Sequence, residues 1–126
     1  MSFSNTFETH VLQYVFTTTS LTRPTAWYVG LFTTDPTDAD SGTEVSGTDY
    51  ARESVTFSVT GDTASNTAAI EFTAAGSNWG TVTHVGIYDA ASSGNLIAHA
   101  SLTASKAIDT GDVFRIPTGD LDVTLA

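Results

Sequence analysis

Short apolar runs recur along the chain from residue 26 onward, and residues that form turns separate them. The runs cover residues 26–32, 53–60, 68–72, 81–89, 95–102, 112–116 and 121–125. In two of them apolar side chains occupy alternate positions, Val55, Phe57 and Val59 in one, and Leu121, Val123 and Leu125 in the other. Runs at this spacing predict an antiparallel β-sandwich, jelly-roll-like, with about seven or eight strands, rather than alternating strands and helices.

Two runs share the pattern Val-Gly-(Leu/Ile)-(Phe/Tyr), at residues 29–32 and 85–88, and each leads into a loop that contains aspartate. Residues 26–32 are apolar at odd and even positions, which predicts a strand covered on both faces, by a second sheet and by the N-terminal helix. A glycine inside a strand indicates a close neighbour, so Gly30 and Gly86 are expected to pass a bulky group such as Trp27 or Trp79. We interpret the two runs as paired core strands.

Residues 4–16 are expected to form a short amphipathic helix. Its apolar stripe consists of Phe7, Val11, Leu12, Val15 and Phe16. Ser4 or Asn5 is the expected N-cap, and Glu8 lies in the first turn, where the helix dipole favours a carboxylate. Pro24 prevents any further extension of the helix. We therefore expect one domain over residues 1–126, with residues 1–20 as an N-terminal arm and helix.

The chain is strongly acidic, with a formal net charge of −10 and only four lysine and arginine residues in 126. A protein of this charge repels phosphate backbones, so a nucleic-acid partner is not expected. No run approaches the roughly 18 apolar residues of a membrane span, and the N-terminus lacks the pattern of a signal peptide. The absence of cysteine excludes disulfides and thiolate metal sites.

The loop at residues 33–49 is the longest polar segment and carries Asp35, Asp38, Asp40, Glu44 and Asp49. Several carboxylates in one loop are the ligands that calcium prefers, but Gly42 and Asp49 stand where an EF-hand needs other residues. The alternatives are a looser surface calcium site and a solvated turn-forming loop, and we favour the second.

Two histidines, His84 and His99, are expected on adjacent strands of one hairpin, where they form a polar pair or bind zinc with further ligands. No pattern supplies those ligands, and no Gly-x-Ser-x-Gly motif is present. Glu71 is expected to be exposed, opposite Ile70 and Phe72, without a second carboxylate to act with it. We therefore predict no catalytic residue, no metal site and no cofactor.

Several runs taken together resemble a family of small tailed-bacteriophage virion proteins, described as tail fibre-like or head decoration-like. The residues that carry the resemblance are "EVSG…YAR" at 44–52, "WGTVTHVGIYD" at 79–89 and "GDLDVTL" at 119–125, and it extends from about Leu12 to Leu125. The resemblance implies a non-enzymatic virion protein with a β-sandwich core, made in the host cytoplasm. Its partners are then phage structural proteins, either the major capsid protein or tail proteins.

Within this family the compact acidic chain, which has no fibre-type repeat, favours a capsid decoration (cement) protein that bridges capsid subunits as a homo-oligomer, for example a trimer. The first alternative is a tail-associated protein of a fibre, adaptor or baseplate. The second is a carbohydrate-binding module in which Trp27 and Trp79 stack on sugars.

We expect the contacts between subunits to come from the arm or from the 33–49 loop. The candidate interface residues are Phe3, Phe7, Val11, Asp35, Asp38, Asp40 and Glu44. The alternative for the helix is that it only covers a sheet of its own domain.

Overall fold

The computed structural model describes residues 1–125, which form ten strands and one helix. In chain order these are β1 (Ser2–Phe3), α1 (Asn5–Phe16), β2 (Trp27–Phe32), β3 (Glu53–Val55), β4 (Phe57–Thr60), β5 (Thr63–Asn66), β6 (Ile70–Thr73), β7 (Gly80–Tyr88), β8 (Leu96–Ile108), β9 (Val113–Ile116) and β10 (Asp122–Thr124). The prediction of a mainly β fold with a short N-terminal helix is confirmed.

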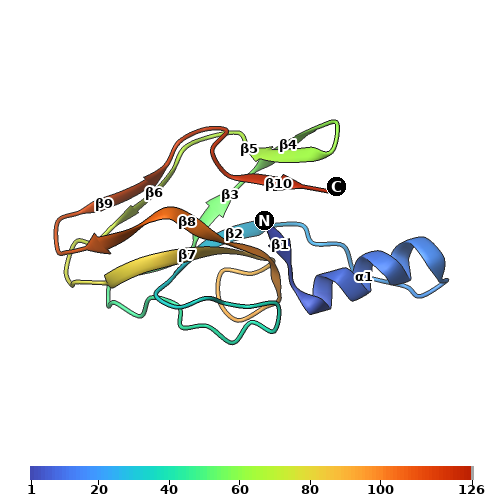
Figure 1. The fold of residues 1–126 in the computed structure, drawn as a ribbon, viewed down its shortest axis with the longest axis horizontal. Helices are drawn as coiled ribbons and strands as arrows, with labels where there is room; N and C mark the ends of the chain where they lie inside the picture. The colour runs from blue at the N-terminus through green and yellow to red at the C-terminus, as the bar shows by residue number, and fades with distance from the viewer. Residues whose placement is uncertain (126) are drawn as a thin grey trace.

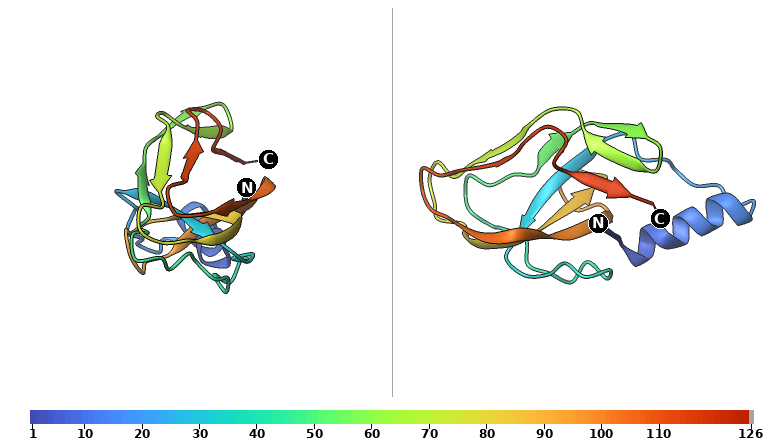
Figure 2. Two further views of the ribbon diagram at one scale, coloured as in Figure 1. Left: turned by 90° about the vertical axis from the view of Figure 1, so that its left-hand side faces the viewer. Right: turned by 45° about the horizontal axis from the view of Figure 1, so that its top comes forward.

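The strands form three antiparallel sheets that lie in two layers (Figures 1 and 2). One layer is the five-stranded sheet, in the order β1-β8-β7-β2-β3. The other layer consists of the three-stranded sheet β10-β5-β4 and the two-stranded sheet β6-β9. The main core lies between the layers, where Phe72 stacks on Tyr50 with ring centroids 6.3 Å apart and meets Phe114 edge-on.

The two runs with the shared pattern are neighbouring strands, as predicted. β2 pairs with β7 in a register that places Gly30 opposite Gly86. A Cβ atom at Gly86 would lie 2.9 Å from both Leu96 Cδ1 and Phe32 Cε2, and one at Gly30 would lie 2.6 Å from Glu44 Oε2. The bulky neighbours are therefore these side chains, and the suggestion of Trp27 or Trp79 was wrong.

The second face of β2 is covered by the loop at residues 33–49, and the expectation that the N-terminal helix covers it was wrong. Phe32, Tyr88 and Leu96 form a separate buried cluster. The loop runs along this side of the five-stranded sheet (Figure 2), and its Asp40 accepts a hydrogen bond from the Tyr88 hydroxyl at 2.6 Å. A polar loop can cover these residues because hydrogen bonds within the loop and to β7 and β8 satisfy its polar groups.

The segment 53–60 is not one alternating strand. It breaks at Thr56, and β3 joins the five-stranded sheet while β4 joins the three-stranded sheet. Val59 lies on the same face of its sheet as Phe57 and Val123, which pack against the core, yet it is 72% exposed, and Leu125 is also exposed. Two strands that the sequence did not indicate are β1 and β5, the second of which lies in a stretch rich in turn residues.

Candidate interaction surface

The first turn of α1 is fixed to the β-sheet. Ser4 is the N-cap, and its Oγ accepts a hydrogen bond from the N–H of Phe7 at 3.2 Å and donates to the carbonyl of Leu96. The N–H of Ser4 donates to the carbonyl of Ile97, and the N–H of Asn5 donates to the carbonyl of Asp38, each at 2.9 Å. The predicted cap is therefore confirmed, and it ties the helix to β8 and to the 33–49 loop.

Beyond this first turn, α1 extends away from the sheets (Figures 1 and 2), and none of its residues is buried. The exposed large apolar side chains are Val11 at 38%, Leu12 at 58%, Tyr14 at 78%, Val15 at 59% and Phe16 at 78%. Phe3 and Phe7 are partly buried against the core, with their ring centroids 5.4 Å apart. The predicted apolar stripe exists, but most of it faces solvent.

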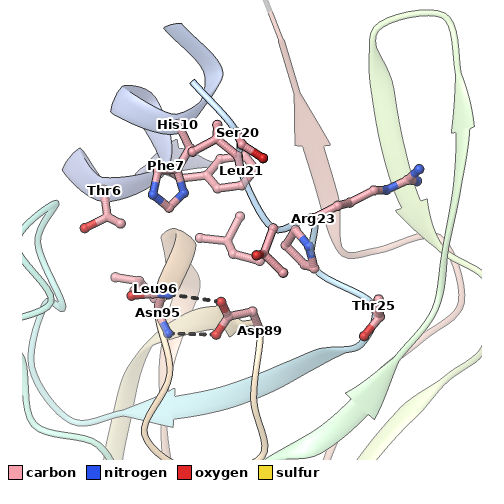
Figure 3. Close-up of a pocket in the computed structure, with 13 residues that line it drawn as sticks. Thr6, Phe7, His10, Ser20, Leu21, Arg23, Thr25, Asp89, Asn95 and Leu96 are labelled. Carbon is pink, nitrogen blue, oxygen red and sulfur yellow. Dashed lines mark hydrogen bonds between the residues drawn. The ribbon is translucent and has the colours of Figure 1, made fainter. Parts of the chain in front are cut away.

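A groove of about 440 Å³ lies between α1, the segment 20–25 and the turn that joins β7 to β8 (Figure 3). Phe7, His10 and Leu21 lie on the helix side of the groove. On the opposite side, the backbone and side-chain amides of Asn95 donate to the Asp89 carboxylate at 2.7 and 3.1 Å. The groove continues along Val11 and Tyr14 of the helix. We define the exposed residues Val11, Leu12, Tyr14, Val15 and Phe16 as the α1 surface.

The acidic residues of the 33–49 loop make contacts within the chain. Asp35 Oδ1 accepts from the N–H of Thr37 at 2.8 Å, in an Asx-type turn, and Asp38 Oδ1 lies 2.8 Å from His99 Nε2. Asp40 binds the Tyr88 hydroxyl, and Glu44 binds Arg52. These four candidate interface residues fix the loop to the sheet, while the carboxyl groups of Asp35 and Asp38 stay half exposed.

The two histidines of the predicted hairpin, His84 and His99, both lie close to the 33–49 loop. His99 pairs with Gly86 across β7 and β8, and His84 pairs with Ser101. His84 Nε2 lies 3.9 Å and His99 Nδ1 lies 3.8 Å from the carboxylate of Asp35. The structure thus places both histidines around one aspartate and fixes the start of the loop to β7 and β8.

Glu44 and Arg52 form a bidentate ion pair that the sequence analysis did not identify. Arg52 Nε and Nη2 donate to the two carboxylate oxygens of Glu44, each at 2.9 Å, and the Arg52 side chain is only 8% exposed. Its Nη1 donates to the carbonyls of Ala90 and Ser93, at 3.0 and 2.8 Å. Arg52 therefore connects the 33–49 loop to the turn between β7 and β8.

Two tyrosines complete this network. The guanidinium carbon of Arg52 lies 3.5 Å from the centroid of the Tyr88 ring, and the Tyr50 hydroxyl donates to Glu44 at 2.7 Å. Burial raises the pKa of both tyrosine hydroxyls, so both stay protonated donors. Burial alone would lower the pKa of Arg52, but the hydrogen bonds and charge of Glu44 outweigh it and raise that pKa.

Asp49 fixes the segment 76–79 through three hydrogen bonds. Its carboxylate accepts from the N–H of Gly76 at 2.7 Å, the hydroxyl of Ser77 at 2.8 Å and Nε1 of Trp79 at 3.0 Å. These donors, Trp79 first, hold the pKa of Asp49 well below its ordinary value of 3.8. The carboxylate is therefore a structural anchor and stays ionised in the folded chain.

A lowered pKa in the folded state predicts how stability changes with pH. The stabilisation from Asp49 is complete above its unfolded pKa of about 4 and is lost as the pH falls below that value. We expect the stability of the wild type to decrease more than that of Asp49→Asn as the pH falls from about 5 to about 2. This range brackets the carboxyl pKa of the unfolded chain. Urea unfolding at each pH measures the difference. The control is Asp120→Asn, which removes a carboxylate outside these hydrogen bonds; equal curves for the wild type and Asp49→Asn would contradict the assignment.

The charged side chains of the body and the apolar side chains of α1 form two separate groups. Within residues 1–125 no three His, Cys, Asp or Glu side chains are grouped so as to hold a metal ion. In the same part of the chain, no helix has the length and apolar character needed to span a membrane. The charged residues described above bind one another and the backbone, whereas α1 presents exposed apolar side chains.

The fold and this surface define a small, acidic, mainly β structural protein with one projecting helix. The family model described as "Podophage GP4 fiber I protein gp80" matches residues 2–124, and the chain belongs to this family of phage fibre proteins. No curated protein matches the chain. The family confirms the resemblance to phage virion proteins and is a family of tail fibre-like structural proteins.

Arg52, Tyr50 and Tyr88 are the residues that sequence reasoning missed. Tyr50 and Arg52 fall within the quoted motif "EVSG…YAR". A buried arginine needs a carboxylate partner. The presence of Glu44 and Arg52 in one motif was therefore the sequence signal that could have predicted their ion pair. Tyr88 comes from the distant shared-pattern strand, so only the register of β2 and β7 brings it to the network.

Proposed function

We propose that the chain is a non-enzymatic structural component of a phage tail fibre, located on the virion and bound to other phage structural proteins. The observation that carries the proposal is the family match over residues 2–124. The use of Glu44, Asp49 and Arg52 as structural anchors supports a role without chemistry. The arm at residues 1–20 is the proposed contact region, because it contains five of the eight exposed large apolar side chains of the described residues. The proposed contact residues within it are Phe3, Phe7 and Val11.

Capsid decoration is the second candidate function. The net charge of −10 and the compact paired sheets favour it, because a fibre shaft is normally built from repeats and this chain has none. In this second candidate function the loop residues Asp35, Asp38, Asp40 and Glu44 contact a capsid subunit through the parts of their side chains that stay exposed. Both functions use the chain as a building block and differ in its place on the virion.

Labelling of the parent virion separates the two locations. The turn at Gly61 and Asp62, between β4 and β5, is exposed and accepts a short epitope insertion, since a Cβ atom at Gly61 meets no other atom within 4 Å. We expect electron microscopy with a gold-labelled antibody to mark the tail. Label confined to the capsid would overturn the fibre assignment and support decoration.

The non-enzymatic part of the proposal has a separate test. Release of sugar from host polysaccharide by the purified chain would contradict it.

A further inference from the structure

One side of the two-layer fold carries a strand edge that no other strand of the chain covers. On this side the five-stranded sheet ends with β1 and β8, and the other layer ends with β10 (Figures 1 and 2). β1 pairs with β8 only at Ala98 and His99, and within residues 1–125 no further strand pairs with this edge. The edge of β8 is therefore free from Ser101 to Ala107, where every side chain except that of Leu102 is exposed. We call these residues the β8 edge.

The backbone of the β8 edge offers hydrogen bonds to solvent. The carbonyl of Ile97 accepts from the N–H of Ser4 on the β1 side, and alternate residues of a strand point their backbone groups the same way, so Ser101 presents its N–H and C=O there. Residues 102–105 follow as a bulge that stands opposite Thr83 alone in β7. A free edge is a template for a strand of another chain, and the bulge limits it to a short one.

Apolar side chains of both layers meet this open side. Met1 and Leu102 from the five-stranded sheet and Val123 from β10 pack against the core but are only partly buried. On the face of the three-stranded sheet that carries Val123, Leu125 is 59% exposed and Val59 is 72% exposed. The apolar layer between the sheets is thus incomplete here. A further strand with apolar side chains at alternate positions would complete it.

The charge of the chain selects the kind of partner. Glu8 and Arg23 cancel within residues 1–25, so the whole net charge of −10 lies on residues 26–126. Asp122 on β10 and Asp38 beside β8 keep exposed carboxyl groups, and Lys106 is the only cation of these two strands. A second copy of the chain would bring the same negative charge to this side, whereas a basic segment is complementary to it.

We propose that the β8 edge binds an extended segment of another protein, which joins the five-stranded sheet as an added strand from Ser101 onward. Apolar side chains at every second position of this segment cover Leu102 and Val123, and basic side chains at the positions between face the acidic surroundings. Backbone hydrogen bonds supply the affinity in this mode of recognition, and the alternate side chains supply the specificity. β1 already pairs with β8 in this way over two residues. The site lies outside the arm at residues 1–20, so it provides a second contact.

The test titrates the purified, isotope-labelled full chain with a synthetic peptide as long as the β8 edge, in which valine and lysine alternate. We expect the peptide to shift the NMR signals of β8 and β10 and to slow hydrogen exchange at the Ser101 amide. A peptide of the same composition, with its valines and lysines in separate blocks, should bind about tenfold more weakly or less, because it cannot present apolar side chains on one face.

Two variants remove the features that the proposal uses. Ser101→Pro deletes the outward N–H at an edge position, where proline is tolerated, and should weaken peptide binding by about tenfold or more. Leu125→Lys places a cation beside the basic peptide and changes only an exposed side chain, so it tests the site even where the proline variant does not fold. The matched control is Leu12→Lys, which is 58% exposed on α1 and should keep the wild-type affinity.

Several results would overturn the proposal. They are equal binding of the two peptides, no binding by the folded wild type, and signal changes confined to α1 or to the opposite edges β3 and β4. Protection of the Ser101 amide that rises with chain concentration, without peptide, would assign the β8 edge to a second copy and overturn it as well. Because the experiment uses the isolated chain, its result is independent of the location that virion labelling gives.

Discussion

Replacing Arg52 with alanine is expected to lower the free energy of unfolding by about 3 kcal/mol, near the lower end of the cost of breaking a buried ion pair. The lower end applies because Glu44 keeps 24% of its side-chain exposure and water reaches it when the arginine is gone. The variant also loses the hydrogen bonds to Ala90 and Ser93 and the contact with the Tyr88 ring. Urea unfolding followed by tryptophan fluorescence measures the change.

The chain contains a matched control for this prediction. Arg115 Nε lies 3.2 Å from Glu71, but both side chains are more than half exposed, at 56% and 58%. Exposed ion pairs contribute about 0–1 kcal/mol, so Arg115→Ala should have a small effect. Arg52→Lys should recover little of the loss, because an ammonium group cannot bind both carboxylate oxygens and two carbonyls in one plane. Equal effects of Arg52→Ala and Arg115→Ala would contradict the role of the buried network.

The network also supports the groove beside α1. The carbonyls that bind Arg52 belong to the turn between β7 and β8, and Asp89 and Asn95 at the ends of that turn line the groove. An ion pair within the body therefore fixes the shape of the surface next to the projecting helix. The wide separation in sequence between Arg52 and this turn explains why local patterns did not indicate the connection.

Much of the fold could be predicted because its signals are local. The apolar runs gave most strands, and Ser4 followed by the stripe from Phe7 gave the helix. The pair Gly30 and Gly86 indicated equivalent strands, and the register places them opposite one another. β5 was missed because its sequence, Thr-Ala-Ser-Asn, has the composition of a turn and gains its strand partners from β4 and β10.

The candidate surface was harder to predict, because amphipathic helices usually cover their own sheet. The sequence identified Phe7 and Val11 as candidates but could not tell whether the stripe faces the core or solvent. The decision rests on the 33–49 loop, which takes the place beside β2 through Asp38, Asp40 and Glu44. Asp38 and Asp40 have partners distant in the sequence, on β8 and β7, so the outcome depends on the packing of the whole chain.

Replacing Trp79 with alanine is expected to lower the free energy of unfolding by about 3–5 kcal/mol, as for other large core residues. Trp79 is 6% exposed, and its ring meets the ring of Tyr50 edge-on at 5.4 Å between centroids. The change also removes one donor from Asp49 and the ring that packs against Gly47, where a Cβ atom would lie 2.5 Å from Trp79 Cδ1. Thermal and urea unfolding monitored by circular dichroism measure the loss.

The Trp79→Phe variant separates the packing of this residue from its hydrogen bond. Phenylalanine keeps most of the apolar contact and loses only the indole N–H, and the partly exposed Asp49 keeps its donors Gly76 and Ser77, so the expected cost is well below that of Trp79→Ala. The same pair of variants tests the sugar-stacking alternative for Trp79. A tryptophan that stacks on sugar must expose its ring, and such a site would be stabilised by added oligosaccharide in the wild type but not in Trp79→Ala. With the ring enclosed by Tyr50, Gly47 and Asp49, we expect added sugar to leave the melting temperature of all three proteins unchanged, and a sugar-dependent rise that only the wild type shows would contradict this structural role.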